Sequence, residues 1–418
     1  MEHLSAAHQL ATGLRALPHI ATAFASTQAA WRFWRNARIS LPDLQAPLIS
    51  AARQQIAETC QDFVLCVHDW TVLSFTKHKS KKERKMIVGA AGGLGYELQT
   101  ALLISDLQGD PLAVAVQSLF VENGLLTTRS VDKKPHITQI DEVTEQSTFV
   151  DALELPLPVV HIIDRGGDSV FHYREFSRRQ ERFLIRADAI GGVEFKGVTM
   201  KLGEVARRLD KQFSERVLYK GSEQSQYVGE TRVVLKRAAR PHRQKDGVRQ
   251  PRVIIKGEAL ELRLIVSEVR DETGQVLSQW LLLSNVEETV KASQLARWYY
   301  YRWRIESFFK LLKSAGQELE NWQQEEPLAL LKRLLVASMA CVVVWQLQRD
   351  ESDQASEARR LLVRLSGRQM KWGCESTAPA LMTGLWSLLA ILDVLENYTL
   401  DEIKKLTEII LPPQMRPG

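Results

Sequence analysis

Cysteine is scarce in this 418-residue chain, and no apolar run is both long and uninterrupted. The cysteines lack the spacing of a metal-binding set, and two lie in apolar runs as small core residues; they are Cys60, Cys66, Cys341 and Cys374. The apolar stretch that starts at Leu328 is broken by Lys332 and Arg333, and the first residues lack the basic start of a signal peptide. We therefore expect no signal peptide, no membrane span, and a reducing, cytoplasmic location.

A large excess of either charge is also absent. Lys and Arg total 55 against 50 Asp and Glu, which gives a net charge of +5 and a pI of about 8.9. This balance is compatible with nucleic-acid binding but does not identify it. With 45% hydrophobic and 25% charged residues, the chain has the composition of an ordinary globular protein of two or three domains.

Basic residues are nevertheless concentrated in two segments. Residues 77–85, KHKSKKERK, contain six Lys or Arg in nine positions, and residues 236–252, KRAARPHRQKDGVRQPR, are similarly basic and contain two prolines. Either segment is a solvated loop or a contact for a phosphate backbone. Composition alone leaves both interpretations open.

Residues 297–313, RWYYYRWRIESFFKLLK, have polar positions that a core helix would not need. At about 100° per residue, a helix gathers five polar side chains into one stripe roughly 80° wide. These are Tyr299, Arg302, Glu306, Lys310 and Lys313. A carboxylate flanked by cations is costly to bury without partners, so we expect the stripe to face water, a metal ion or a polyanion, with phosphate as the best match.

Spacing alone leaves a simpler alternative. Arg302 and Lys310 stand four residues from Glu306 on either side, and such pairs are a common surface arrangement worth only tenths of a kcal/mol. In that case the segment would carry no chemistry.

The spacing of Tyr299, Arg302, Glu306 and Lys313 resembles the Tyr-Arg-Glu-Lys signature of DDE transposases of the insertion-sequence-4 family, which includes the transposase of transposon five. Residues 301–327, YRWRIESFFKLLKSAGQELENWQQEEP, are similar to the signature helix of that family and the turn that follows it. The resemblance extends over about residues 28–400. It implies two further catalytic aspartates upstream, each after a hydrophobic strand.

Both aspartates are present. Residues 63–67 are predicted to form a short buried strand that leads into Asp69. Residues 158–163, PVVHII, give the clearest buried strand of the chain and lead into Asp164. His68 adjoins the first acid without zinc-ligand spacing, and Asp168 would replace Asp164 only if its strand ended later. We predict that Asp69, Asp164 and Glu306 meet at one edge of a sheet.

Three carboxylates at one site favour hard divalent cations. We expect two Mg²⁺ or Mn²⁺ ions, bound by Asp69, Asp164 and Glu306, that activate water or a 3′-hydroxyl and stabilise the leaving oxygen. In the family the same acids cut the transposon end and join it to target DNA. The resemblance implies that the other signature residues hold DNA phosphates, namely Tyr299, Arg302 and Lys313.

Two residues outside the signature segment also match the family. Trp280, in a predicted strand, aligns with a tryptophan that stacks on a flipped-out base in the family, whereas a tryptophan buried in the sheet is the alternative. Arg186 falls in the predicted strand 183–188, where the family often has an arginine that contacts DNA. A lone arginine on a strand is more commonly a surface residue.

The predicted order after residue 60 is strand, strand, strand, helix, strand, helix, strand, which resembles the ribonuclease-H-like fold of the family. We predict an α/β protein with a ribonuclease-H-like mixed-sheet catalytic core, an inserted antiparallel β subdomain, and helical amino- and carboxyl-terminal regions. The expected parts are 1–60, helical; 61–190, first part of the core; 191–288, the β subdomain; 289–348, signature helix and rest of the core; and 349–418, helical and dimerising. Predicted strands in the insertion are 214–219, 231–236, 252–255, 260–269 and 276–283, and the turn at 272–274 predicts that the last two form a hairpin. The first three strands after residue 60 are expected to form an antiparallel meander. Predicted terminal helices are 4–17, 27–36, 327–349, 358–368, 376–397 and 400–410.

The sequence therefore predicts a bacterial, nucleoid-associated DNA transposase that moves an insertion sequence by cut-and-paste transposition. Its partners would be double-stranded DNA, at transposon ends and target, and a second copy of the chain in the DNA complex. The part before residue 28 is shorter than in the family, so an alternative is an amino-terminally shortened inhibitor of a longer transposase. A third is a ribonuclease-H-like nuclease, which shares the acids but does not need Trp280 or the phosphate-holding residues.

Overall fold

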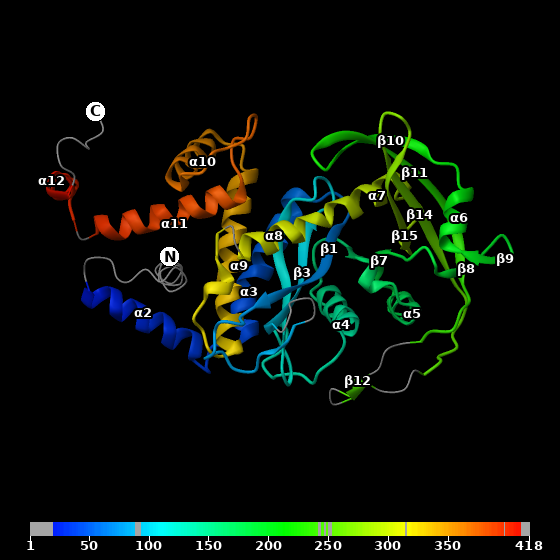
Figure 1. Cartoon of the computed structure of the whole chain (residues 1–418), viewed down its shortest axis with the longest axis horizontal. Helices are drawn as coiled ribbons and strands as arrows, with labels where there is room; N and C mark the ends of the chain where they lie inside the picture. Colours follow the sequence, from blue (N-terminus) through cyan, green and yellow to red (C-terminus); the bar gives the residue numbers. More distant parts are fainter. Residues whose placement is uncertain are drawn as a thin grey trace. The chain divides into compact units, whose positions relative to one another are not determined.

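The computed structural model describes residues 20–87, 93–240, 244–245, 248–249, 253–313, 316–396 and 398–410. They form a mixed α/β protein with helices and one large, mostly antiparallel sheet (Figure 1). The chain divides into two compact units. We call Ser40–Phe308 the sheet unit, and Met1–Ile39 with Phe309–Gly418 the helical unit. The predicted helix at residues 4–17 lies outside the described residues.

The sheet begins with a meander of antiparallel strands that continues into parallel pairs. Its strand order is β5-β4-β3-β1-β6-β7-β15-β14-β11-β8-β9, with β2 beside β3 and β10 beside β11. The first seven strands are β1 (Val64–Ser74), β2 (Lys85–Met86), β3 (Leu94–Ser105), β4 (Pro111–Val121), β5 (Gly124–Thr127), β6 (Val159–Ile163) and β7 (Arg182–Arg186). The β1-β3-β4 pairs are antiparallel, as predicted, and β1-β6 and β6-β7 are parallel.

One predicted boundary near the candidate site is wrong. Strand β1 was expected to end before Asp69, yet it continues to Ser74. The reason is β3, which pairs with β1 over its full length, from Ser105 opposite Val64 to Gly95 opposite Ser74. Asp69 therefore lies within a strand and not in a loop.

The remaining strands extend the same sheet through the pairing of β7 with β15. They are β8 (Gly192–Phe195), β9 (Val198–Lys201), β10 (Gln212–Tyr219), β11 (Ser222–Leu235), β14 (Leu260–Arg270) and β15 (Val276–Ser284), while β12 (Gln244–Lys245) and β13 (Val248–Arg249) form a separate pair. The β14-β15 hairpin is confirmed, with Gly274 at a φ of 85° in its turn. The strand predicted at 252–255 is wrong for its described residues, which contribute only an isolated bridge between Ile255 and Ala239. The five-part division of the chain stays a prediction.

Helices of the sheet unit cover its strands. They are α3 (Leu41–Thr59), α4 (Gln139–Asp151), α5 (Val170–Arg178), α6 (Leu202–Arg208) and α7 (Ala292–Tyr301). A capping box between Ser40 and Asp43 starts α3. Helices α4 and α5 pack against each other, and in the view of Figure 1 they lie on the other side of β7 from α7.

The segment predicted as one helix over 297–313 forms two. Helix α7 ends at Tyr301 and α8 (Trp303–Lys313) follows, with Arg302 between them. The N–H of Arg302 donates to the carbonyl of Tyr299, and the N–H of Ile305 donates to that of Arg302. These three-residue bonds tighten the chain at the junction. Helix α8 begins in the sheet unit and ends in the helical unit.

The helical unit contains α2 (Ile20–Arg35), α9 (Pro327–Arg349), α10 (Asp353–Ser366), α11 (Ala378–Leu395) and α12 (Leu400–Ile410). The predicted helices that fall within the described residues are present, although α2 starts seven residues and α10 five residues earlier than expected. Ser352 caps α10. Among the described residues, α9 alone has the length and apolar composition of a membrane-crossing helix. However, 83% of its apolar window is buried, as in the core helix of a soluble protein.

Candidate active site

Asp69 and Asp164 are neighbours because β1 and β6 run parallel. Their register pairs His68 with Ile163, so the two acids are the next residues on adjacent strands. Adjacent strands lie about 4.8 Å apart, which brings the two carboxylates to the same place on the sheet. Asp164 directly follows the last residue of β6, and its Oδ1 accepts a hydrogen bond from the N–H of Gly166 at 2.7 Å.

Arg302 joins the first acid to the third. Its Nη1 donates to Asp69 Oδ2 at 2.7 Å, and its Nη2 donates to Glu306 Oε1 at 2.8 Å. The Asp69 and Arg302 side chains are only 13% and 10% exposed, whereas Glu306 is 41% exposed. The simple surface pair between Arg302 and Glu306 is therefore part of a larger, mostly buried cluster.

The environment of Asp69 favours its protonated form. Burial raises the pKa of Asp69 from 3.8 to about 6, and the negative charges of Asp164 and Glu306 add to this effect. The Arg302 guanidinium and the N–H of Trp70 act in the opposite direction, but they do not cancel the cost of desolvation. A cation near Asp69 would relieve the repulsion among the acids.

Tyr299, Arg186 and Trp280 lie beside this cluster. Tyr299 is 3% exposed, and its hydroxyl is hydrogen-bonded to Arg186, the last residue of β7. Burial raises the pKa of Tyr299, and the charge of Asp164 also raises it. The Trp280 ring is half-buried on β15, and its centroid is 5.2 Å from that of Tyr299. Three residues that the resemblance assigned to DNA contacts thus lie together, with Tyr299 between Arg186 and Trp280 and within electrostatic range of Asp164.

Lys313 is described with the helical unit, at the carboxyl end of α8. Its Nζ lies 3.9 Å from Glu320 Oε1, and burial lowers the pKa of Lys313. Its predicted role at the acids remains a prediction.

The carboxylates retain oxygens that a cation could use. Within the described residues, Asp164 Oδ2 and Glu306 Oε2 have no hydrogen bond, while Asp69 Oδ2 and Glu306 Oε1 share Arg302. Carboxylate oxygens are the ligands that Mg²⁺ and Mn²⁺ prefer. The donor set therefore fits a divalent cation. For the cation to use Asp69 Oδ2 or Glu306 Oε1, the Arg302 guanidinium must move away or share that oxygen with the cation.

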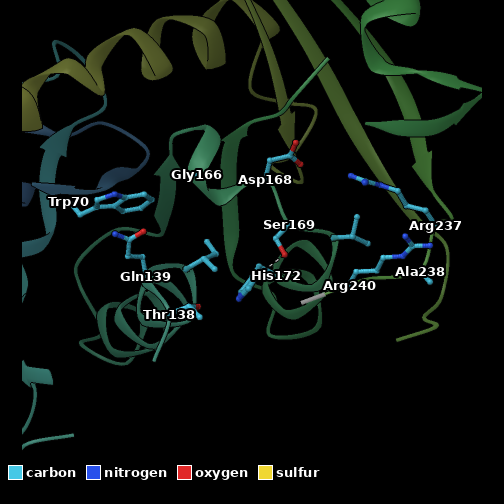
Figure 2. A pocket seen from close by; sticks show the side chains of 12 residues that line it. Trp70, Thr138, Gln139, Gly166, Asp168, Ser169, His172, Arg237, Ala238 and Arg240 are labelled. Atoms are coloured by element: carbon cyan, nitrogen blue, oxygen red, sulfur yellow. Dashed lines mark hydrogen bonds between the residues drawn. The ribbon is translucent and has the colours of Figure 1, made fainter. Parts of the chain in front are cut away.

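A cleft of about 620 Å³ is lined by residues that are close in the chain to two of the acids (Figure 2). Its lining includes Trp70 and Gly166, which follow Asp69 and Asp164 closely in the chain, and Arg237 and Arg240 on the far side. Sequence reasoning did not find this cleft. The available signals were the aromatic residue directly after the first acid and the basic segment 236–252, of which residues 241–243, 246–247 and 250–252 lie outside the described part.

Asp168, the alternative second acid, is already bound by protein groups. Its Oδ1 accepts from the Tyr173 hydroxyl at 3.1 Å, and its Oδ2 accepts from the N–H of Asp188 at 2.7 Å. Because β6 ends at Ile163, the condition under which Asp168 would replace Asp164 is not met. Asp168 instead fixes the start of α5 to the chain after β7.

The first basic segment is partly used for packing. Lys81 is buried with its Nζ 4.2 Å from the centre of the Phe75 ring, and Lys85 pairs with Glu97 at 3.1 Å. These two cations therefore serve the sheet unit itself.

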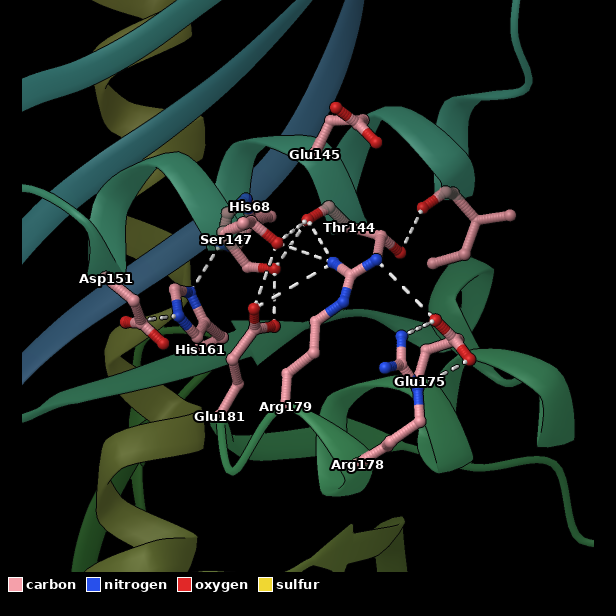
Figure 3. Close-up of polar contacts among 12 residues, drawn as sticks. His68, Thr144, Glu145, Ser147, Asp151, His161, Glu175, Arg178, Arg179 and Glu181 are labelled. Atoms are coloured by element: carbon pink, nitrogen blue, oxygen red, sulfur yellow. Dashed lines mark hydrogen bonds and ion pairs between the residues drawn. The ribbon is translucent and has the colours of Figure 1, made fainter.

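A buried polar network lies behind the acids (Figure 3). His68 Nε2 and His161 Nδ1 are 2.9 Å apart, and both side chains are fully buried. His68 Nδ1 contacts Gln146 Oε1 at 3.3 Å, and His161 Nε2 contacts Asp151 Oδ1 at 3.1 Å. Both partners are on α4. Burial, together with His161, lowers the pKa of His68 to about 3. The histidine pair thus ties α4 to the two strands that carry Asp69 and Asp164.

Cys66 completes a group with the two histidines. Its Sγ is 3.4 Å from His68 Nε2, and the donor atoms of Cys66, His68 and His161 all lie within 4.8 Å of one another, close enough to hold a metal ion. Sequence spacing did not reveal this group because His161 comes from β6 while the other two come from β1. Burial raises the pKa of the Cys66 thiol well above its usual range, which opposes metal binding through a thiolate.

Comparisons with known proteins add a distant structural neighbour. No protein-family model and no curated protein sequence matches the chain. Among solved structures, the protein is similar to the piggyBac transposase in a cryo-EM synaptic complex with hairpin DNA, with a TM-score of 0.37 and 10% identity over 90% of this chain. The match spans 65% of the piggyBac chain, which is less than two thirds of its length.

Proposed function

We propose that this protein is a DDE transposase of the insertion-sequence-4 type, which cuts DNA at the ends of an insertion sequence and transfers the strand to target DNA. The observation that carries the proposal is the bridge from Arg302 to Asp69 and Glu306, beside Asp164 on the adjacent parallel strand. Arg302 of the signature segment thereby contacts the first acid of the predicted set and links it to Glu306. A surface ion pair would not need that third partner.

The sheet supports a ribonuclease-H-like core as part of this proposal. Strands β1, β3 and β4 are antiparallel, and β6 and β7 continue the sheet in parallel from the other side of β1. Asp69 stands on the central strand and Asp164 at the end of its parallel neighbour.

Each residue has a role that its environment supports. Two Mg²⁺ or Mn²⁺ ions bound to Asp69, Asp164 and Glu306 would supply a metal-activated nucleophile and a stabilised leaving oxygen. Arg302 holds Asp69 and Glu306 in place and keeps part of its guanidinium close enough to contact a phosphate. Tyr299 and Arg186 form a second hydrogen-bonding pair at Asp164. Trp280 presents a half-buried ring for a base.

The test is cleavage of linear DNA that carries the ends of the element, in Mg²⁺ or Mn²⁺. We expect strand cleavage and transfer by the protein, and a loss of at least about 10³-fold in Glu306→Gln, because a metal ligand is removed. Glu272→Gln is the matched control, since Glu272 is an exposed carboxylate in the β14-β15 turn. Equal activity in both variants would contradict the proposal.

Two further arms separate the alternatives. An amino-terminally extended form that cuts where this chain only inhibits would identify a shortened inhibitor. Cleavage of an RNA–DNA hybrid, with no strand transfer, would identify a nuclease. We further propose that the protein acts as a homodimer on double-stranded DNA in the bacterial cytoplasm, at the nucleoid.

A further inference from the structure

The cleft beside the acids has an uneven distribution of paired and unpaired charges. Both oxygens of Asp168 accept hydrogen bonds from protein groups, and His172 contacts Ser169 through Nδ1 and Asp141 through Nε2. By contrast, Arg237 and Arg240 are exposed and make no side-chain hydrogen bond or ion pair with any described residue. Among the described residues, the cleft thus presents two unpaired guanidinium groups against the one hydrogen-bonded carboxylate of Asp168, and this balance favours an anionic ligand.

The opposite wall offers an aromatic ring. Trp70 is half-buried and packs at one edge against the core of the sheet unit, and its indole lines the cleft (Figure 2). An indole facing a cleft favours a flat ring such as a nucleobase, because stacking on an aromatic does not depend on base identity. A phosphate-binding side and a ring-binding side together describe a nucleotide.

The cleft reaches the acids around the end of β6. Trp70 and Asp69 are consecutive in β1, so their side chains lie on opposite faces of the sheet. Shortly after the end of β6, Gly166 lies close to Trp70 and to Asp164, because a Cβ there would be 2.4 Å from the Trp70 ring and 2.9 Å from Asp164 Oδ1. A strand that passes this edge could place one phosphate at the acids and the next nucleotide in the cleft.

The size of the cleft argues for an unpaired nucleotide and against a duplex. A volume of about 620 Å³ lies in the range of small-ligand sites. A duplex is about 20 Å wide and presents its bases only through its grooves, so its bases could not reach the indole. Only a nucleotide without a pairing partner could stack on Trp70.

We propose that this cleft binds an unpaired nucleotide of the DNA strand that is cut, with its base on Trp70 and its phosphates at Arg237 and Arg240. This inference rests on the proposed function and extends it by naming single-stranded DNA as a ligand next to the acids. It also distinguishes Trp70 from Trp280, which lies on β15 and packs against Tyr299.

The experiment measures binding without cleavage. The full chain in EDTA is titrated with a fluorescent dT12 strand and with a blunt duplex of the same length, across a range of salt concentrations. For Arg237→Ala/Arg240→Ala we expect dT12 affinity to fall at least about tenfold. The slope of log affinity against log salt concentration should become less steep by about 1.4, since each single-strand phosphate contact contributes about 0.7 to that slope. Duplex affinity should change less than about threefold.

The matched control is Arg207→Ala/Arg208→Ala, which removes the same charge from exposed positions of α6 that do not line the cleft. A strand with 2-aminopurine reports stacking. Its quenching should persist in Trp70→Phe and be lost in Trp70→Leu, with both melting temperatures recorded. If the control pair weakens dT12 binding as much as the cleft pair, or if quenching survives in folded Trp70→Leu, the proposal is overturned.

Cleavage by the unaltered protein is measured separately. Cleavage without a binding effect of the cleft variants would refute this inference alone. Cleft-dependent binding of dT12 without any cleavage would refute the proposed function and leave a single-strand site.

Discussion

Arg302 Nη1 donates to Asp69 Oδ2 at 2.7 Å, although the two residues are 233 positions apart in the chain. The contact joins the junction of α7 and α8 to the middle of β1. Because Arg302 also contacts Glu306, one guanidinium orients two of the three carboxylates. Four predictions concern this cluster and its surroundings.

Replacing Arg302 should destabilise the metal-free protein. Arg302→Ala leaves the mostly buried Asp69 without its cation, and removing one partner of a buried pair costs about 3–5 kcal/mol. The measurement is urea unfolding at about pH 7.5 in EDTA. Arg304→Ala is the control, because Arg304 makes only an exposed contact with the carbonyl of Gln108, and we expect a change within about 0.5 kcal/mol. An equal loss of unfolding free energy in Arg302→Ala and Arg304→Ala would show that the Arg302 bridge contributes nothing to stability.

The raised pKa of Asp69 predicts the direction of a pH effect on stability. The pKa of Asp69 in the folded state, about 6, lies above the ordinary value of 3.8. The contribution of Asp69 to the free energy of unfolding is therefore fully present below pH 3.8 and is lost as the pH rises through about 6. Without metal, the protein should therefore lose up to about 3 kcal/mol relative to Asp69→Asn between about pH 4 and pH 7. Paired unfolding curves at several pH values provide the measurement. A stability difference that is constant with pH would contradict this prediction.

The buried histidine pair should show strong energetic coupling. His161→Leu leaves His68 Nε2 buried without its nitrogen partner, and the expected cost is about 1–3 kcal/mol. Replacing both histidines by leucine removes the unsatisfied group, so the double variant should lose less than the sum of the two single variants. The measurement is a double-mutant cycle of unfolding free energies. Additivity within about 0.5 kcal/mol would argue against the pair.

Gly166 should tolerate no side chain during catalysis. A Cβ at this position would lie 2.4 Å from Trp70 Cη2 and 2.9 Å from Asp164 Oδ1, so alanine must displace one of them. We expect Gly166→Ala to slow DNA cleavage about 10- to 100-fold, because small displacements of reacting groups are costly. Gly192→Ala is the control, since its Cβ would meet nothing within 4 Å. Equal cleavage rates in the two variants would mean that Asp164 and Trp70 need no fixed position.

Local sequence patterns predicted much of the frame. The apolar run before Asp164 and the turn at Gly274 each have a physical cause within a few residues, and both elements formed as expected. The spacing of Arg302 and Glu306 likewise predicted a shared helical face. The structure places that pair beside Asp69, while the roles of all three remain predictions.

Features that depend on distant partners were not predictable in this way. The extension of β1 beyond Asp69 depends on pairing with β3, and a strand's length is set by its neighbour as much as by its own residues. The break of the signature helix at Arg302 and the pair formed by His68 and His161 likewise need segments far apart in the chain. The cleft combines β1, the turn after β6 and the residues after β11, and no local pattern unites them.

Because β1 continues on both sides of Asp69, successive side chains of this strand alternate between the two faces of the sheet. His68 and Trp70 point toward the face with α4, and Asp69 points toward Arg302. A single residue inserted or deleted between Cys66 and Asp69 would exchange these faces, placing the carboxylate among the buried histidine partners and an apolar or imidazole group at the acids. This stretch should therefore tolerate no change in length.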